Sequence, residues 1–288
     1  GDDTVAIGHD ALSAFTGSDA TAVGAYAADA AVANGNLVAI GKNAYGSATS
    51  GDNNTAVGTS SLSLMVSGDS NTALGYGTGL NATGNRNTLI GGSAGYYPTS
   101  IDDCVAVGYH ALLGSSGNTT GDYNIAIGSY ALDATTSGSG NVAVGHQALT
   151  ALTTGVHNVA IGQSALDVEH FNVAIGYSAL GAETAGASGC VAIGGYALQS
   201  QSVASANNVA VGYSAGLNLS IGTASVYMGY LAGGAGIITG ASNVAIGMNA
   251  ALNATAMSNS VFIGEQAGGV GVVAGDSNVA IGKFAGKV

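Results

Sequence analysis

Residues 158–166 read Asn-Val-Ala-Ile-Gly-Gln-Ser-Ala-Leu, and residues 172–180 repeat the pattern as Asn-Val-Ala-Ile-Gly-Tyr-Ser-Ala-Leu. The central part of this pattern recurs seventeen times in the 288 residues. It usually has four positions: a β-branched residue, then alanine, then valine or isoleucine, then glycine. The closing residues, called the motif glycines below, are Gly8, Gly24, Gly41, Gly58, Gly75, Gly91, Gly108, Gly128, Gly145, Gly162, Gly176, Gly194, Gly212, Gly229, Gly247, Gly264 and Gly282. Their spacing runs from 14 to 20 residues and averages about 17. Such an array is typical of a solenoid.

Each repeat has the pattern of a short strand. Val159, Ala160 and Ile161 alternate bulky and small side chains with a period of two, which places valine and isoleucine on one face and alanine on the other. The glycine permits a bend, and residues 163–166 are expected to form a return strand before a polar, turn-forming linker. We predict an all-β chain, a parallel β-roll or β-solenoid of about 17 rungs with two short strands each. It would be one repetitive domain over residues 1–288, as an excerpt of a longer chain or an element of a filament.

The composition excludes several classes of protein. The chain has 49 glycines, one proline and only 7% charged residues. Glycine without a period of three excludes collagen, and 47% hydrophobic residues argue against disorder. Apolar runs are too short for a transmembrane helix, so we expect no membrane insertion of this segment. The net charge of −12 disfavours a nucleic-acid partner.

The alanine at the centre of the strand motif occurs in fourteen copies and suggests an interface. We expect these alanines to point outward as a flat apolar ledge, which usually marks a contact surface. The alternative is that they pack inside a narrow roll. Because one rung carries few large side chains, a single roll would be marginally stable, which favours self-association.

The recurring Asn-Val-Ala-Ile-Gly-x-x-Ala-Leu resembles the head repeat of trimeric autotransporter adhesins, the YadA-like head, over essentially the whole chain. The resemblance implies a left-handed parallel β-roll, a homotrimer and a binding surface displayed on bacterial cells. Similar arrays with long loops also resemble segments of phage tail fibres. The location implied is therefore extracellular, on a bacterial cell surface or a virion.

Two sets of polar residues precede the strand motif. Asparagine occupies this position in ten copies, namely Asn54, Asn71, Asn87, Asn124, Asn141, Asn158, Asn172, Asn208, Asn243 and Asn278. We predict that these side chains bond turn backbone or stack as a polar ladder. Cys104 and Cys190 share the position five rungs apart, too far for a disulfide within one straight roll. We expect structural thiols, with bridging between chains as the alternative.

Tyrosines supply the candidate binding surface. Eight of the thirteen lie one or two residues after a motif glycine and would form a stripe along the solenoid. They would either cover the bend and pack on neighbouring rungs or bind a carbohydrate or protein. The residues proposed to contact a ligand are Tyr76, Tyr109, Tyr177, Tyr213 and Tyr230.

Signals for catalysis and for metals are weak. The histidines have no spacing typical of zinc ligands, and no nucleophile lies in a pattern with a base. Asp167, Glu169 and His170 form the densest ionisable group, for which a solvated turn is favoured over paired carboxylates of a glycosidase. Turns such as residues 51–53 and 121–123 leave weak calcium binding open. We therefore predict no enzyme and no cofactor.

The leading hypothesis is a segment of a trimeric surface-attachment fibre that contacts a glycan or protein receptor on a host cell or its matrix. The alternative is a purely structural shaft or filament subunit without a receptor site. Both predict self-association, including end-to-end assembly in the second case.

Overall fold

The computed structural model describes residues 3–32, 35–115, 119–166, 170–181, 188–200, 207–220, 222–269 and 274–286. The chain divides into two compact units, residues 1–154 and 155–288. Each unit is a parallel β-solenoid, which confirms the predicted fold class. In a solenoid each rung contacts only its neighbours, so a division into two groups of contacts is compatible with one continuous repetitive domain. The single domain predicted over residues 1–288 therefore stays a prediction.

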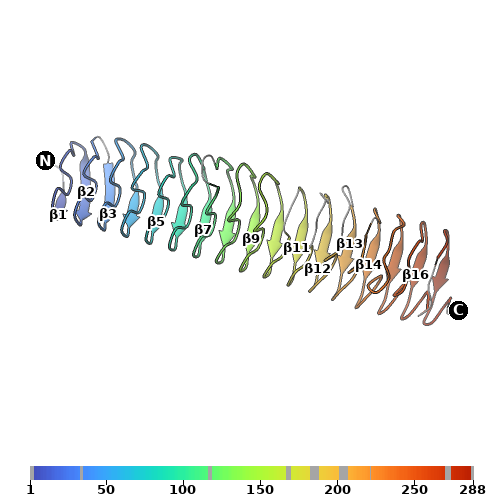
Figure 1. The fold of residues 1–288 in the computed structure, drawn as a ribbon. Coiled ribbons are helices and arrows are strands. Elements are labelled where there is room, and N and C mark those ends of the chain that lie inside the picture. The colour runs from blue at the N-terminus through green and yellow to red at the C-terminus, as the bar shows by residue number, and fades with distance from the viewer. Residues whose placement is uncertain are drawn as a thin grey trace. The chain divides into compact units, whose positions relative to one another are not determined.

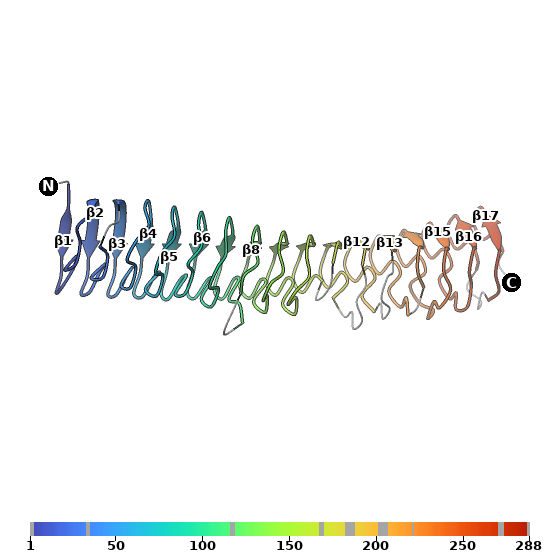
Figure 2. The same cartoon turned by 90° about the horizontal axis from the view of Figure 1, so that it is seen from above.

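In the first unit each rung is one short strand followed by a loop that returns to the next strand (Figure 1). Its strands are β1 Val5–Ile7, β2 Ser18–Val23, β3 Gly35–Ile40, β4 Thr55–Val57, β5 Thr72–Leu74, β6 Thr88–Ile90, β7 Val105–Val107, β8 Ile125–Ile127 and β9 Val142–Val144. Consecutive strands pair in parallel with the motifs in register, as Ala6 with Ala22 in β1 and β2. Figure 2 shows the blue-to-green arrows of this unit side by side along one edge.

The second unit repeats the arrangement. Its strands are β10 Val159–Ile161, β11 Val173–Ile175, β12 Val191–Ile193, β13 Val209–Val211, β14 Val226–Met228, β15 Val244–Ile246, β16 Val261–Ile263 and β17 Val279–Ile281. The register is again that of the motif, so Ala160 pairs with Ala174 and Ala174 with Ala192. Equivalent side chains therefore form columns that run from rung to rung. No helix in the described residues is long and apolar enough to cross a lipid bilayer.

The strand alternation is as predicted, but the expected outward alanine ledge is wrong. From β2 to β17 the central alanine or its replacement is buried, while the motif residues on either side of it are half-buried or exposed. The physical reason is the narrow rung. Buried residues of the returning turn, such as Leu166, leave room for only a methyl group on the strand side. The exposed columns are those of valine, threonine and isoleucine.

The predicted return strand is also wrong, because the segment after each motif glycine is a turn. Alternate residues adopt a left-handed backbone, as Ser164 at φ 53° and Leu166 at φ 50° do. This segment still bonds to both neighbouring rungs. The N–H of Tyr26 donates to the carbonyl of His9 at 2.8 Å, and the N–H of Ala28 to that of Ala44 at 2.9 Å. Each rung thus has one strand and one hydrogen-bonded turn.

Where the central alanine is replaced, the turn opposite is reduced to glycine. Leu89 lies against Gly95, at whose position a Cβ would meet the leucine Cδ1 at 3.0 Å. A Cβ at Gly268 would likewise meet Cδ1 of Phe262 at 2.7 Å. Since most other rungs pair alanine with leucine, the buried volume is kept by exchanging a large and a small residue across the core.

The asparagine ladder is present as predicted. Asn71 is buried, its Nδ2 donates to the carbonyl of Gly84 at 2.8 Å, and its Oδ1 accepts the N–H of Asn87 at 3.0 Å. Where serine takes this position, the Oγ of Ser225 accepts the N–H of Asn243 at 3.0 Å. The side chains thus satisfy buried backbone groups where the chain turns into the strand.

Candidate ligand-binding surface

The five tyrosines predicted to contact a ligand are exposed. Each directly follows a motif glycine, and their side chains are between 48% and 68% exposed. The residue after this glycine lies on the outside of the rung because the chain bends there, away from the buried alanine of the strand. The structure thus places Tyr76, Tyr109, Tyr177, Tyr213 and Tyr230 on the surface, and their role in binding stays a prediction.

In the second unit, tyrosines of four consecutive rungs form a continuous row. The ring centroids of Tyr177 and Tyr196 are 5.2 Å apart, and those of Tyr196 and Tyr213 are 5.6 Å apart, both edge-on. Tyr213 and Tyr230 follow at 5.8 Å with nearly parallel rings. We call these four residues the tyrosine ladder. Desolvation by neighbouring groups, with a further contribution from the flanking phenols, raises the pKa of Tyr196 above its usual value. The ladder gives amphipathic contact area with hydroxyl tips.

In the first unit, histidines join the tyrosines. Tyr109 stacks on His110 with ring centroids 3.9 Å apart, and Tyr130 lies edge-on to both at 5.6 and 5.3 Å. His146 continues the group at 6.2 Å from Tyr130. We call these residues the Tyr–His cluster. The zinc-ligand spacings considered for the histidines do not reveal this cluster. The available signal is that His110 and His146 lie one or two residues after a motif glycine, as the tyrosines do.

A second set of exposed aromatic residues lies at the opposite turn and was not predicted. Tyr123 and Phe171 are 63% and 61% exposed, and His157 stacks on Phe171 at 5.5 Å with an interplanar angle of 2°. All three directly precede an asparagine of the ladder, so their shared register was the signal in the sequence.

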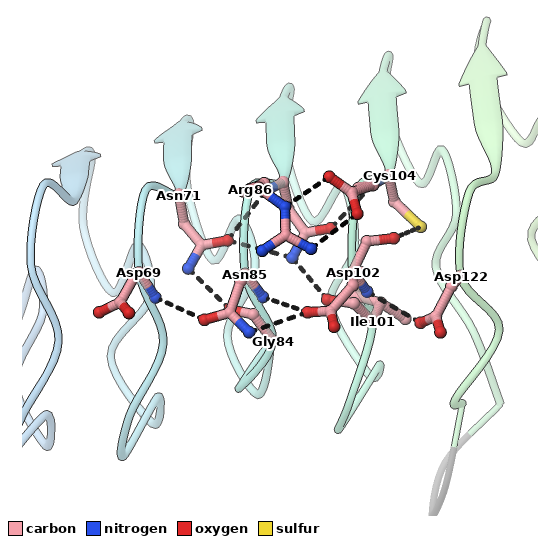
Figure 3. A network of polar contacts seen from close by, with 11 residues as sticks. Asp69, Asn71, Gly84, Asn85, Arg86, Ile101, Asp102, Cys104 and Asp122 are labelled. Atoms are coloured by element: carbon pink, nitrogen blue, oxygen red, sulfur yellow. Dashed lines mark hydrogen bonds and ion pairs between the residues drawn. The ribbon is translucent and has the colours of Figure 1, made fainter.

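The aspartates of the polar turns bond backbone from rung to rung (Figure 3). Oδ1 of Asp52 accepts the N–H of Gly35 at 2.8 Å, and Oδ1 of Asp122 accepts the N–H of Asp102 at 2.9 Å. Beside this column Arg86 forms two 2.7 Å bonds with Asp103, which holds the pKa of that carboxyl below its usual value. The aspartates of the two turns considered for calcium thus each bind the preceding rung.

The other candidate residues have structural surroundings. His170 accepts the backbone N–H of Val156 at Nδ1, at 3.0 Å, whereas Asp167 and Glu169 lie outside the described residues. Within the described ranges, no three His, Cys, Asp or Glu side chains are grouped to hold a metal ion. Cys104 and Cys190 are buried, as expected for structural thiols, and burial raises the pKa of Cys104 to about 12.

The strands expose a separate apolar surface. In the second unit the outer residues of β10 to β17 are all valine, isoleucine or methionine. Ile161, Ile193, Met228 and Ile263 are between 36% and 40% exposed. At about 4.8 Å between strands, eight strands give two aliphatic columns about 34 Å long. We call this surface the aliphatic face. In the first unit threonine interrupts the corresponding column at Thr21, Thr55, Thr72 and Thr88.

The comparisons with known proteins identify no family. No protein-family model matches the chain, and no curated protein matches it significantly. The fold is that of a parallel β-solenoid, and the likeness to adhesin heads rests on the repeated motif alone.

Proposed function

We propose that this chain is a non-enzymatic segment of a trimeric fibre that attaches to a surface through its row of exposed tyrosines. The observation that carries the proposal is the tyrosine ladder, four rings on consecutive rungs that contact one another. Tyr177, Tyr213 and Tyr230 are exposed to solvent, and Tyr196 between them is half-buried. A rigid backbone holds the rings in place, so binding costs little conformational entropy. Rings of this kind suit a glycan or a protein surface.

Self-association through the aliphatic face is part of the proposal. Sixteen outer positions of β10 to β17 carry no polar side chain, and exposed apolar patches beyond roughly 300–600 Å² usually mark an interface. Three copies around an axis would cover this face. The homotrimer, the left-handed winding and the extracellular setting on a bacterial cell or a virion follow from the resemblance to YadA-like heads and phage fibres.

The test of attachment is binding of purified protein to arrays of glycans, matrix proteins and whole cells. Replacing Tyr177, Tyr213 and Tyr230 with alanine together should reduce binding at least tenfold, because each buried aromatic contact contributes about 1 kcal/mol or more. The matched control is Tyr123→Ala, an exposed tyrosine at the opposite turn of the rung.

Two results would contradict attachment through the tyrosine ladder. One is a parent protein that binds no array component, and the other is a triple variant that binds as well as its parent. If the protein associates with itself but binds nothing else, the structural shaft becomes the better proposal. The rung-to-rung asparagine and aspartate bonds, which stiffen the solenoid without any receptor, favour that alternative.

A further inference from the structure

A polar groove on the first unit shares no lining residue with the tyrosine ladder or the Tyr–His cluster. It crosses the turns that follow β2, β3 and β4 and has a volume of about 260 Å³. Its lining includes Tyr26, Asp29, Asn43, Ser47, Ser63 and Leu64. Pockets for drug-sized ligands usually start at about 300 Å³, so the groove has the size for one small ring. We call it the Tyr26 groove.

The polar side chains of this groove are available to a ligand. Neither the carboxylate of Asp29 nor the amide of Asn43 makes a side-chain hydrogen bond within the described part of the chain, and both side chains are half-buried. This differs from Asp52 and Asp122, whose carboxylates bind backbone. A half-buried carboxylate and amide without partners form an acceptor and a donor group at one place.

The backbone fixes these groups. The N–H of Asn43 donates to the carbonyl of Ala25 at 3.0 Å, and the N–H of Ala30, next to Asp29, donates to the carbonyl of Gly46 at 3.3 Å. Gly46 forms part of the groove, and a Cβ there would lie 3.5 Å from Oδ1 of Asp29. The glycine thus leaves open space beside the carboxylate, and the ladder of turns holds the two side chains on adjacent rungs.

Tyr26 adds an apolar surface to the groove. Its side chain is 38% exposed and is supported by an edge-on contact with His9, whose ring centroid is 5.2 Å away. An aromatic face beside a carboxylate and an amide matches the two sides of a pyranose, which has a C–H face and an edge of adjacent hydroxyls. No lysine or arginine is among the groove residues, and the chain carries a net charge of −12. An acidic sugar would therefore be repelled.

We infer that the Tyr26 groove binds one pyranose ring of a neutral glycan through two adjacent hydroxyls. The carboxylate of Asp29 accepts hydrogen bonds from both hydroxyls, the amide of Asn43 donates to one of their oxygens, and the ring of Tyr26 covers the C–H face. This inference rests on the proposed attachment function and names a ligand class for it, with residues other than those of the tyrosine ladder. A single ring in a shallow groove gives millimolar affinity, so tight attachment would need repetition over several chains.

The experiment is saturation-transfer NMR with titration of the full chain by methyl α-mannoside, methyl β-galactoside, methyl β-glucoside, N-acetylglucosamine and sialic acid. At least one neutral sugar should bind, and sialic acid should not. Asp29→Asn keeps the shape and removes the charge, so its affinity should fall about tenfold or more, since hydrogen bonds to charged groups contribute roughly 1.5–3 kcal/mol. Tyr26→Ala should also weaken binding, whereas Tyr123→Ala should not. Circular dichroism of each variant reports whether the solenoid is intact.

The outcomes separate this inference from the attachment proposal. If no neutral sugar binds, or if Asp29→Asn and Tyr26→Ala bind as their parent does, the groove is not a sugar site. Attachment through the tyrosine ladder stands in that case if the array experiment gives binding that depends on Tyr177, Tyr213 and Tyr230. Binding of sialic acid in preference to neutral sugars would also overturn the inference.

Discussion

At each motif glycine the backbone takes a φ between +120° and +141°. At most of them, as at Gly8 and Gly264, the carbonyl of the following motif glycine also lies where a side chain would begin. The first condition disfavours any residue with a Cβ, and the second excludes it sterically. The repeat therefore keeps glycine at this position because neighbouring rungs stack at the spacing of hydrogen-bonded strands. The steric constraint acts between neighbouring rungs, because the blocking carbonyl belongs to the next motif glycine.

The first prediction separates the steric constraint from the conformational one. A Cβ at Gly264 would meet the carbonyl oxygen of Gly282 at 2.6 Å, whereas a Cβ at Gly282 has its nearest neighbour, Ala285 Cβ, at 4.0 Å. Gly282→Ala should cost only the unfavourable φ, about 1–2 kcal/mol. Gly264→Ala should cost at least about 3 kcal/mol because backbone must move. Equilibrium denaturation measures both, and equal losses would contradict the steric argument.

At the scale of one rung, structure is maintained by columns of equivalent residues. The asparagine column illustrates this, since each buried amide bonds a turn carbonyl of the next rung and accepts the N–H of the next column residue. Loss of one amide leaves two buried backbone groups without partners. Burial without a partner costs about 1–3 kcal/mol per group, far more than an exposed hydrogen bond contributes.

The second prediction concerns this column. Asn71→Ala removes the partner of the Gly84 carbonyl and of the Asn87 N–H, and should lower the free energy of unfolding by about 2–4 kcal/mol. Asn71→Ser should cost less, because serine at position 225 accepts the equivalent N–H. Denaturation of both variants, with amide hydrogen exchange at Asn87, measures the difference. A serine variant no better than alanine would show that the hydroxyl cannot replace the amide at this rung.

The strand of each rung was predictable from the sequence, and its partner segment was not. Alternation in Val159, Ala160 and Ile161 identifies a strand and its two faces, because it depends only on the pleat. Which face is buried depends on what closes the rung. The left-handed backbone at Leu166 is not evident from leucine itself. Glycine four residues after the motif glycine, as at Gly79 and Gly95, was the available signal for a positive φ.

The candidate binding surface was predictable to a similar degree. Register alone places Tyr177, Tyr213 and Tyr230 on one side of the rungs, and their exposure follows from their position after the bend. The stacking of Tyr109 on His110 was not predicted. Sequence spacing does not show whether the rings of two neighbouring columns contact each other. The Tyr26 groove joins residues of three rungs, so no single repeat reveals it.

For the molecule as a whole, low charge follows from the two kinds of column. Buried columns are filled by alanine, leucine and asparagine, and the strands of the second unit add two outer columns with no polar side chain. Both leave few positions for ions, which explains why only 7% of the residues are charged. An aliphatic face about 34 Å long is large for the surface of a soluble monomer. Covering it by further copies of the chain is the simplest way to remove it from water.

The last prediction tests this association. Ile161→Lys combined with Ile193→Lys puts two charges per chain on the aliphatic face, where each side chain is already partly exposed. A lysine at a partly exposed position can extend its ammonium group into water, so we expect the solenoid to stay folded. The parent should have three times the 27.5 kDa mass of one chain by multi-angle light scattering, and the double variant should have the mass of one chain. Ile237→Lys is the matched control, because Ile237 is 62% exposed in a turn outside the face. A monomeric parent would show that the chain does not associate with itself. A double variant that keeps the parent's mass would show that the contact lies outside the aliphatic face. The expected direction follows from desolvation, since burying six unpaired ammonium groups around one axis costs more than the aliphatic contacts contribute.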